Sequence, residues 1–149
     1  YREAGDDWGI ANALDRLAVA VSSQGDSSRA VALLEETLGL NRAIGNQRGV
    51  ANVLINLGRA AAGQGDDERA IALLAEGLAA LQDLGEKWNS ARALVDLADL
   101  ARRRGDLRSA RAYYAESLHL RHGLGDRAGV ALCRRRLADL AGTARGAGR

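Results

Sequence analysis

Residues 64–78 read QGDDERAIALLAEGL, and closely similar stretches lie forty residues to either side. Residues 24–38 read QGDSSRAVALLEETL, and residues 104–118 read RGDLRSARAYYAESL. Similar stretches at a fixed interval of this length are the signature of a repeat architecture, in which each unit packs on its neighbours. The forty-residue period is therefore the observation from which the fold is inferred.

Glycine recurs every twenty residues, and an acidic residue or asparagine follows each one. The pairs are Gly5-Asp6, Gly25-Asp26, Gly45-Asn46, Gly65-Asp66, Gly85-Glu86, Gly105-Asp106 and Gly125-Asp126. Glycine suits the left-handed turn that ends a helix, because it has no Cβ to clash there. A short acidic or amide side chain next to it can accept the free N–H groups that open the following helix. The pattern predicts seven helices, near 6–24, 27–44, 46–64, 67–84, 86–104, 107–124 and 126–142, and no strand.

The apolar residues between these turns have helical spacing. Val50, Val53, Leu54, Leu57 and Ala61 form one stripe, and the following segment has a similar one. Alanine and leucine dominate the apolar set, which favours helix over strand. The predicted fold class is all-α, with consecutive helices packed as antiparallel pairs.

Small and large residues recur at fixed places in these pairs. The small places hold Ala18, Gly58, Ala98 and Ala138 in the first helix and Ala30, Ala70 and Ala110 in the second. The large places hold Leu17, Leu57, Leu97 and Leu137, and Leu34, Leu74 and Tyr114. This alternation resembles the tetratricopeptide repeat, which implies a right-handed superhelical solenoid over essentially the whole chain.

The departures from the usual repeat indicate a subtype. The first-helix tryptophan of the family is replaced by Leu14, Leu54 and Leu94, and the chain contains no proline to end the second helix. A longer second helix accounts for a repeat of forty residues. The chain resembles the forty-residue subtype, as found in the repeat arms of bacterial multidomain regulators.

The repeat divides the chain into one array. Residues 11–50, 51–90 and 91–130 are predicted to be full repeats, residues 1–10 the end of a preceding repeat, and residues 131–149 a terminal half repeat with a mobile tail. The helix at 6–24 is expected to have an uncovered apolar flank, which we expect to support self-association with another copy. Arg134, at a core position, indicates an atypical last helix that faces solvent.

The composition excludes several classes of function. The formal net charge is +2, the only cysteine is Cys133, and no apolar run is long enough for a membrane span. No phosphate-binding loop is present, so the prediction is a non-enzymatic, cytoplasmic protein without a cofactor. Cys133 is interpreted as a small packed side chain. His119 and His122, with Glu116 one turn away, are too few for a caged metal site.

The resemblance implies a concave groove lined by the first helix of each repeat. The groove positions hold Asn12, Asp15, Arg16 and Val19; Asn52, Ile55, Asn56 and Arg59; Arg92, Val95, Asp96, Asp99 and Arg103; and Arg135, Arg136 and Asp139. Asn52 and Asn56 share a helix face, and a carboxamide can both donate to and accept from a peptide backbone. Arg92, Arg103 and Arg136 can select carboxylates. The predicted function is therefore a scaffold that binds a peptide or protein segment, acidic at the C-terminal half.

Three other interpretations stay open. The polar positions can be ordinary solvated faces, and the array can be an intramolecular sensor arm that holds a nucleotide-switching module of a bacterial transcriptional regulator. Direct nucleic-acid binding is less favoured, because three consecutive arginines on a helix span about 200° and aromatic residues make up only 3% of the chain. The carboxylate clamp of chaperone-binding family members is rejected, because Asp15, Val19 and Asp96 occupy places where it needs other residues. Trp8 and Trp88 are expected to pack over helix starts.

Overall fold

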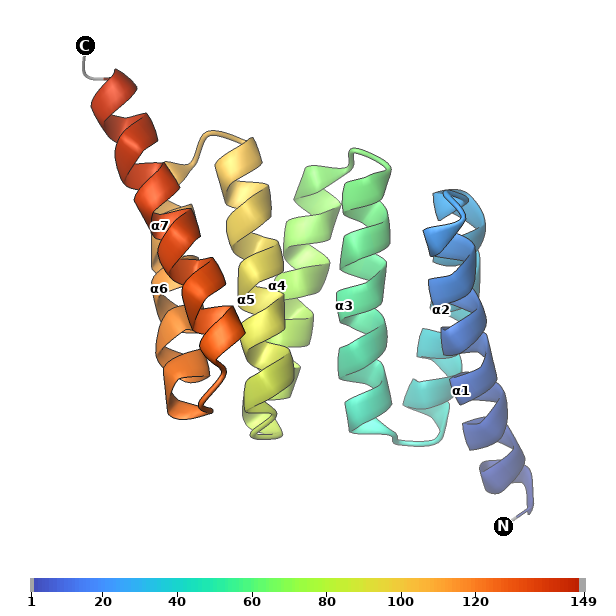
Figure 1. Cartoon of the computed structure of the whole chain (residues 1–149). Coiled ribbons are helices and arrows are strands. Elements are labelled where there is room, and N and C mark those ends of the chain that lie inside the picture. Colours follow the sequence, from blue (N-terminus) through green and yellow to red (C-terminus); the bar gives the residue numbers. More distant parts are fainter. Residues whose placement is uncertain (1, 148–149) are drawn as a thin grey trace. The chain divides into compact units, whose positions relative to one another are not determined.

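The computed structural model describes residues 2–147, with side chains described throughout except at residues 2–5, 7, 144 and 147. Within residues 2–147 the chain forms seven α-helices and no strand, which confirms the predicted all-α fold (Figure 1). The helices are α1 (Arg2–Ser23), α2 (Ser27–Ala43), α3 (Gln47–Gly63), α4 (Asp67–Asp83), α5 (Lys87–Arg103), α6 (Leu107–Gly123) and α7 (Arg127–Ala147). They form two compact units, Tyr1–Leu84 with α1 to α4 and Gly85–Arg149 with α5 to α7.

The turns between helices have the predicted geometry. Gly25, Gly45, Gly65, Gly85, Gly105 and Gly125 all have φ between 70° and 87°. The side chains of Asp26, Asn46, Asp66, Asp106 and Asp126 each accept a hydrogen bond from the backbone N–H three residues later, at 3.0 to 3.3 Å. Glu86 is the exception and makes no such cap bond, because its longer side chain does not suit the cap position. Each glycine therefore ends one helix, and in five of the six turns the next residue caps the following one.

The two ends of the chain differ from the prediction. Gly5 does not end a helix, since α1 begins at Arg2 and runs through it. Glycine permits the left-handed turn but does not impose it. At the other end α7 continues to Ala147 where the sequence predicted a mobile tail after residue 142. Arg145 stands at the place of the turn glycines there, so the helix does not stop. The rest of the predicted tail, residues 148–149, lies outside the described residues, as does Tyr1 of the predicted preceding repeat.

Unit 1 is held together by interlocking large and small side chains. Leu34, Val53 and Leu57 are at most 2% exposed and form one cluster with Ala18 and Ala60. Each such leucine contributes about 2 kcal/mol through burial of its apolar surface. The α3 and α4 helices approach closely at Gly58, where an added Cβ would lie 2.6 Å from Cγ of Leu74. The predicted alternation of large and small positions is confirmed here.

Unit 2 has an equivalent core. Ala98, Ala101, Ala110, Tyr114 and Leu140 form a buried cluster between α5, α6 and α7. Cys133 is also fully buried, as predicted. None of the helices in the described part of the chain has the length and apolarity needed to cross a membrane.

The apolar flank of α1 is uncovered. Leu17 is 44% exposed, whereas its counterparts Leu57 and Leu97 are 2% and 1% exposed. Among the described residues of unit 1, α1 packs mainly on α2, with few contacts to α3, so its remaining flank is left open. Ile10 is 48% exposed on the same helix. The predicted exposed flank is confirmed, and its association with another copy stays a prediction.

Trp8 and Trp88 also project from the surface. The two residues are 56% and 52% exposed. Trp8 lies well inside α1, which begins at Arg2, and Trp88 is the second residue of α5. The expected packing of both tryptophans over helix starts is therefore not confirmed.

Candidate peptide-binding surface

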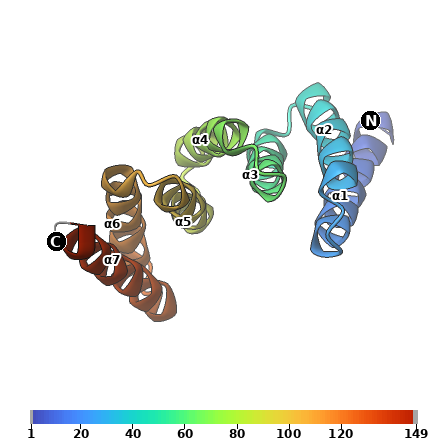
Figure 2. The same ribbon diagram turned by 90° about the horizontal axis from the view of Figure 1, so that it is seen from above.

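In unit 1, α1 and α3 lie on one side of the unit, and α2 and α4 lie on the other (Figure 2). We call the polar side of α1 and α3 the first-helix surface of unit 1. Asn12 and Arg16 are exposed on it, Val19 is 51% exposed, and Asn52 and Arg59 are half-buried. These predicted groove residues are therefore accessible on one side of the unit.

A hydrogen bond joins the two helices across this surface. Nδ2 of Asn56 donates to Oδ1 of Asp15 at 3.1 Å, and the two residues are 41 positions apart in the sequence. One of the two N–H donors of Asn56 is therefore engaged, while a carboxamide retains a second donor and its acceptor oxygen. The structure thus brings together two of the predicted groove residues and reduces what Asn56 can offer to a ligand.

A hollow of about 250 Å³ lies beside this hydrogen bond. It is lined by Ala18, Val19, Ser22, Ser23, Leu34, Asn56 and Arg59. Its apolar lining comes from Ala18, Val19 and Leu34, and its polar lining includes Asn56 and Arg59. The hollow suits a short apolar side chain on a segment whose backbone reaches Asn56. Leu34, Ser22 and Ser23 were not predicted as site residues. Leu34 belongs to the second helix α2, and Ser22 is not at a groove position, whereas Ser23 occupies the same place in its repeat as Arg103.

Ile55 does not belong to this surface, contrary to the prediction. It is only 6% exposed, and a Cβ added to Gly77 of α4 would lie 2.7 Å from its Cδ1. Ile55 therefore packs into the interface between α3 and α4. The signal in the sequence was Gly77 itself, a small residue that leaves room for a large one opposite.

In unit 2 the predicted acidic groove residue Asp99 has an internal partner. The hydroxyl of Tyr114 donates a hydrogen bond to its Oδ1, and Tyr114 is fully buried. Burial raises the pKa of Tyr114, and the hydrogen bond to Asp99 and the charge of that carboxylate raise it further. Asp99 therefore helps to hold α5 to α6. Val95 and Asp96 are half-buried on α5, and Arg92 and Arg103 are exposed.

Arg136 combines partial exposure with a buried, unsatisfied donor. Its side chain is half-buried, and its Nε is shielded from solvent with no hydrogen-bond partner among the described residues. The positive charges of Arg102 and Arg136 oppose the rise in the pKa of Tyr114. A buried donor without an acceptor costs about 1–3 kcal/mol. An acceptor supplied by a ligand would recover part of that cost.

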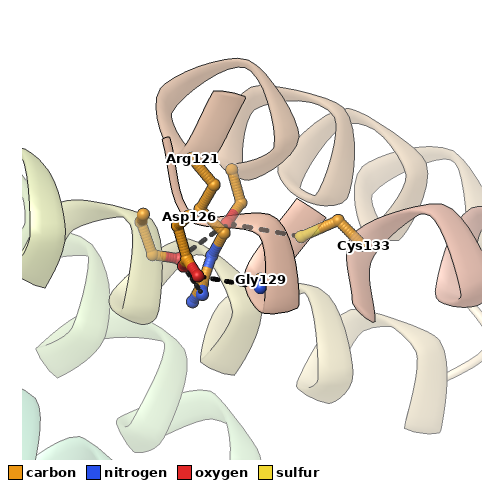
Figure 3. A network of polar contacts seen from close by, with 6 residues as sticks. Arg121, Asp126, Gly129 and Cys133 are labelled. Carbon is orange, nitrogen blue, oxygen red and sulfur yellow. Dashed lines mark hydrogen bonds and ion pairs between the residues drawn. The ribbon is translucent and has the colours of Figure 1, made fainter. Parts of the chain in front are cut away.

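A second polar arrangement in unit 2 joins α6 to the start of α7 (Figure 3). Nη1 of Arg121 pairs with Oδ2 of Asp126 at 2.8 Å, and the two side chains are only 11% and 15% exposed. The other carboxylate oxygen of Asp126 accepts the backbone N–H of Gly129 at 3.0 Å. The ion pair therefore fixes the turn between α6 and α7.

The same network reaches α5. Nε of Arg121 donates to Oγ of Ser117 at 3.1 Å, and that hydroxyl donates to the carbonyl of Ala91 at 2.8 Å. Cys133 contacts the same hydroxyl, with its Sγ 3.7 Å away (Figure 3). All these groups are used in packing the three helices, so the network has a structural role. The repeat pattern does not predict this network, because Arg121 does not recur: Asn41 and Leu81 occupy the equivalent places.

The family is established by comparison with known proteins. The model of the tetratricopeptide repeat family matches residues 9–83, which is half of the chain. The chain therefore belongs to the tetratricopeptide repeat family, as its turns and helix pairs predict. Members of this family are repeat scaffolds for protein–protein interaction, and this coarse description holds for the chain.

Solved structures share the fold. BtubC (BKLC) from P. vanneervenii is 18% identical with a TM-score of 0.68, over 91% of this chain and 65% of that one. Aspartyl phosphate phosphatase F from Bacillus subtilis is 14% identical with a TM-score of 0.78, over 83% of this chain and 32% of that one. The tetratricopeptide domain of Sgt2 from Aspergillus fumigatus is 19% identical with a TM-score of 0.69, over 93% and 82%. At these identities the likeness shows the fold alone, and this chain spans less than two thirds of the first two proteins. No curated protein sequence matches it significantly.

Proposed function

We propose that the first helices of this scaffold bind an extended, acidic segment of another protein. The observation on which this proposal rests is the hollow of about 250 Å³ beside Asn56 and Arg59. It combines an apolar lining with polar groups that can bind a backbone, as small binding sites in proteins commonly do. No side chain at this surface forms a catalytic arrangement, so the proposed activity is binding.

Backbone recognition falls to the two asparagines of α3. Asn52 and Asn56 are four residues apart and both half-buried, so their carboxamides lie on one face of the helix. Asn56 is oriented by its hydrogen bond to Asp15. An oriented side chain loses less entropy on binding than a mobile one. This pair therefore binds an extended chain with little dependence on its sequence.

Charge selection falls to the arginines of unit 2. By sequence, residues 85–149 contain 14 basic and 7 acidic residues, whereas residues 1–84 contain 7 and 12. Arg92 and Arg103 are exposed, and Nε of Arg136 has no acceptor in the part of the chain that the structure describes. Because Asp99 accepts from Tyr114, one of its carboxylate oxygens is already engaged within the protein. A segment that unit 2 binds is therefore acidic.

The proposal can be tested with an immobilised array of short random peptides probed with the purified chain. Wild type should retain peptides rich in Asp and Glu. Asn52→Ala/Asn56→Ala should weaken all of them, and Arg92→Glu should weaken the acidic ones by roughly 5- to 150-fold, as expected for loss of a charged hydrogen bond. Arg108→Glu, an equally exposed arginine on α6, is the matched control and should bind as wild type.

Equal binding by all four proteins would contradict the proposal. If the chain bound none of the random peptides but bound a segment of its own polypeptide, the repeats would instead be an intramolecular arm, as in a multidomain regulator. Retention of an oligonucleotide in place of acidic peptides would favour the nucleic-acid interpretation. A cytoplasmic location is part of the proposal. It agrees with Cys133, which is a free thiol, because cysteines in the cytosol are usually kept reduced.

A further inference from the structure

One face of α7 is uncovered, although the equivalent faces of α3 and α5 are buried. The α7 face consists of Ala131, Arg134, Leu137, Ala138 and Ala141, of which Leu137 and Ala141 are half-buried and the others exposed. The equivalent residues of α3 are Ala51, Leu54, Leu57, Gly58 and Ala61, and all five are buried. Those of α5 are Ala91, Leu94, Leu97, Ala98 and Ala101, and they too are buried. In unit 1 this face packs on the following helix, so the α7 face has the form of a helix-binding surface.

The packing of α4 on α3 shows how such a surface is covered. Gly58 of α3 faces Leu74 of α4, and Ile55 faces Gly77. A step of three residues toward the start of α3 is thus matched by a step of three toward the end of α4. This is the register of an antiparallel pair.

The same register identifies the residue that would lie opposite Arg134. In unit 1 it places Leu54 opposite Leu78, and both are buried. Arg134 stands at the place of Leu54. A leucine opposite it would strip water from the guanidinium without replacing its hydrogen bonds, which is costly. An acidic residue at that place would pair with it.

The described part of the chain does not cover this face itself. The helices α3 and α5 end just before Gly65 and Gly105, whose positive φ turns the chain back over them. Arg145 holds the equivalent place in α7, and the helix continues to Ala147. The turn that would return the chain over the α7 face is therefore not made at this point.

A hollow next to the face supports the same arrangement. It measures about 490 Å³ and is lined by the end of α6 and the start of α7, including His122, Arg127, Val130 and Arg134. The counterpart in unit 1, of about 400 Å³, has a third wall formed by the last turn of α4, which includes Asp83. In unit 2 that third wall is absent among the described residues. The hollow is lined by one acidic side chain, Asp126, which pairs with Arg121, and by four basic ones, Arg121, His122, Arg127 and Arg134. A helix end that completed it would favour an acidic residue.

We propose that the α7 face binds an amphipathic helix of a partner protein, packed antiparallel on α7 as α4 packs on α3. This helix has an acidic residue opposite Arg134 and a second one in its last turn, beside His122 and Arg127. The site is separate from the first-helix surface, so the scaffold holds an extended segment at one place and a helix at another. Apolar contact comes from Val130 and Leu137, and selectivity comes from the charges.

The probe is a synthetic peptide of residues 66–84, the segment that covers α3, made with the natural sequence and with Leu78→Glu. Short peptides are only partly helical in isolation, so binding is weak and is followed by NMR chemical shifts of the labelled full chain. We expect the shifts to concentrate on Val130, Ala131 and their neighbours. Wild type should bind the Leu78→Glu peptide on the order of tenfold more tightly than the natural one.

Two variants test the role of Arg134. Arg134→Leu restores the apolar position and should reverse the preference, while Arg108→Leu on α6 should leave it unchanged. Arg134→Glu should prefer a peptide with Leu78→Lys, which keeps the test valid if the first variant folds poorly. An unchanged preference in both Arg134 variants, or the absence of shifts on α7, would overturn the proposal. Dimerisation of the chain that depends on Arg134 without any peptide would also overturn it, because a second copy would then cover the face.

Discussion

Arg121 shows how a single substitution gives one turn its own structure. The equivalent places hold Asn41 and Leu81, so each turn is fixed differently. Asn41 accepts a hydrogen bond from Asn46 at 3.0 Å, whereas Arg121 forms an ion pair with Asp126 and also reaches Ser117. A partly buried ion pair stabilises only when its remaining donors and acceptors are satisfied. Here the N–H of Gly129 donates to the second carboxylate oxygen of Asp126, and Ser117 accepts from Nε of Arg121.

Gly129 is required for this ion pair. A Cβ at that position would clash with the side chains of both Arg121 and Asp126. We expect Gly129→Ala to displace the pair and to lower the free energy of unfolding by about 1–3 kcal/mol. Gly142→Ala in the same helix is the control, since nothing lies within 4 Å of its added Cβ, and it should stabilise by up to about 1 kcal/mol. Urea unfolding of the two variants measures both changes; equal stability would contradict the role of Gly129.

Tyr114 makes the stability of unit 2 sensitive to alkaline pH. Its pKa is raised by burial and by its hydrogen bond to Asp99, so the folded chain keeps the hydroxyl proton at a pH at which the unfolded chain loses it. The unfolded state then binds fewer protons, and stability falls as the pH rises above about 10. We expect the free energy of unfolding to decrease with pH in this range in wild type, and to decrease less in Tyr114→Phe.

Ultraviolet absorbance of the phenolate gives an independent measurement of this effect. Tyr114 should ionise together with unfolding and not before it. Ionisation of Tyr114 at its ordinary pKa in the folded chain, identified by comparison with Tyr114→Phe, would contradict the raised pKa.

At the scale of the helices, the glycine turns could be predicted from sequence, and the chain ends could not. The five inner helices begin and end within a residue or so of the predicted bounds, because each Gly-acid pair determines both a stop and a start. Gly5 does not mark the end of a helix as predicted, since α1 continues through it. A turn forms where the two flanking helices can pack on each other, and that condition is not encoded in the dipeptide itself.

Replacing a turn glycine by a residue with a Cβ should strain the backbone and lower the stability of the fold. Gly105 has a φ of 81°, and nothing lies within 4 Å of an added Cβ. Gly105→Ala should therefore destabilise through backbone strain alone, by about 1–2 kcal/mol. Gly123→Ala is the control, because Gly123 lies at the end of α6 with equally open space and without positive φ. Thermal unfolding should give a lower midpoint only for Gly105→Ala, and equal midpoints would show that the turn tolerates a side chain.

At the scale of the whole molecule, repetition made the fold predictable and the site only partly so. The forty-residue period predicted the all-α class and the helix pairs, because each pair repeats the same core positions. The family groove pattern assigned Ile55 to the surface, but Gly77 opens space for it in the core. The groove pattern also could not predict the hydrogen bond between Asn56 and Asp15, because the two residues belong to different repeats. Side-chain contacts between repeats depend on three-dimensional packing that a positional pattern does not contain.

The local packing within each unit has a consequence for how quickly the chain folds. Most helix contacts in each unit are between helices adjacent in sequence, and proteins dominated by such local contacts fold in microseconds to milliseconds. The sequence also contains no proline, so the isomerisation that delays refolding of many proteins by about 10–100 s has no site here. Refolding followed by stopped-flow fluorescence of Trp8 and Trp88 should therefore be complete without a phase on that time scale, including after long incubation in denaturant.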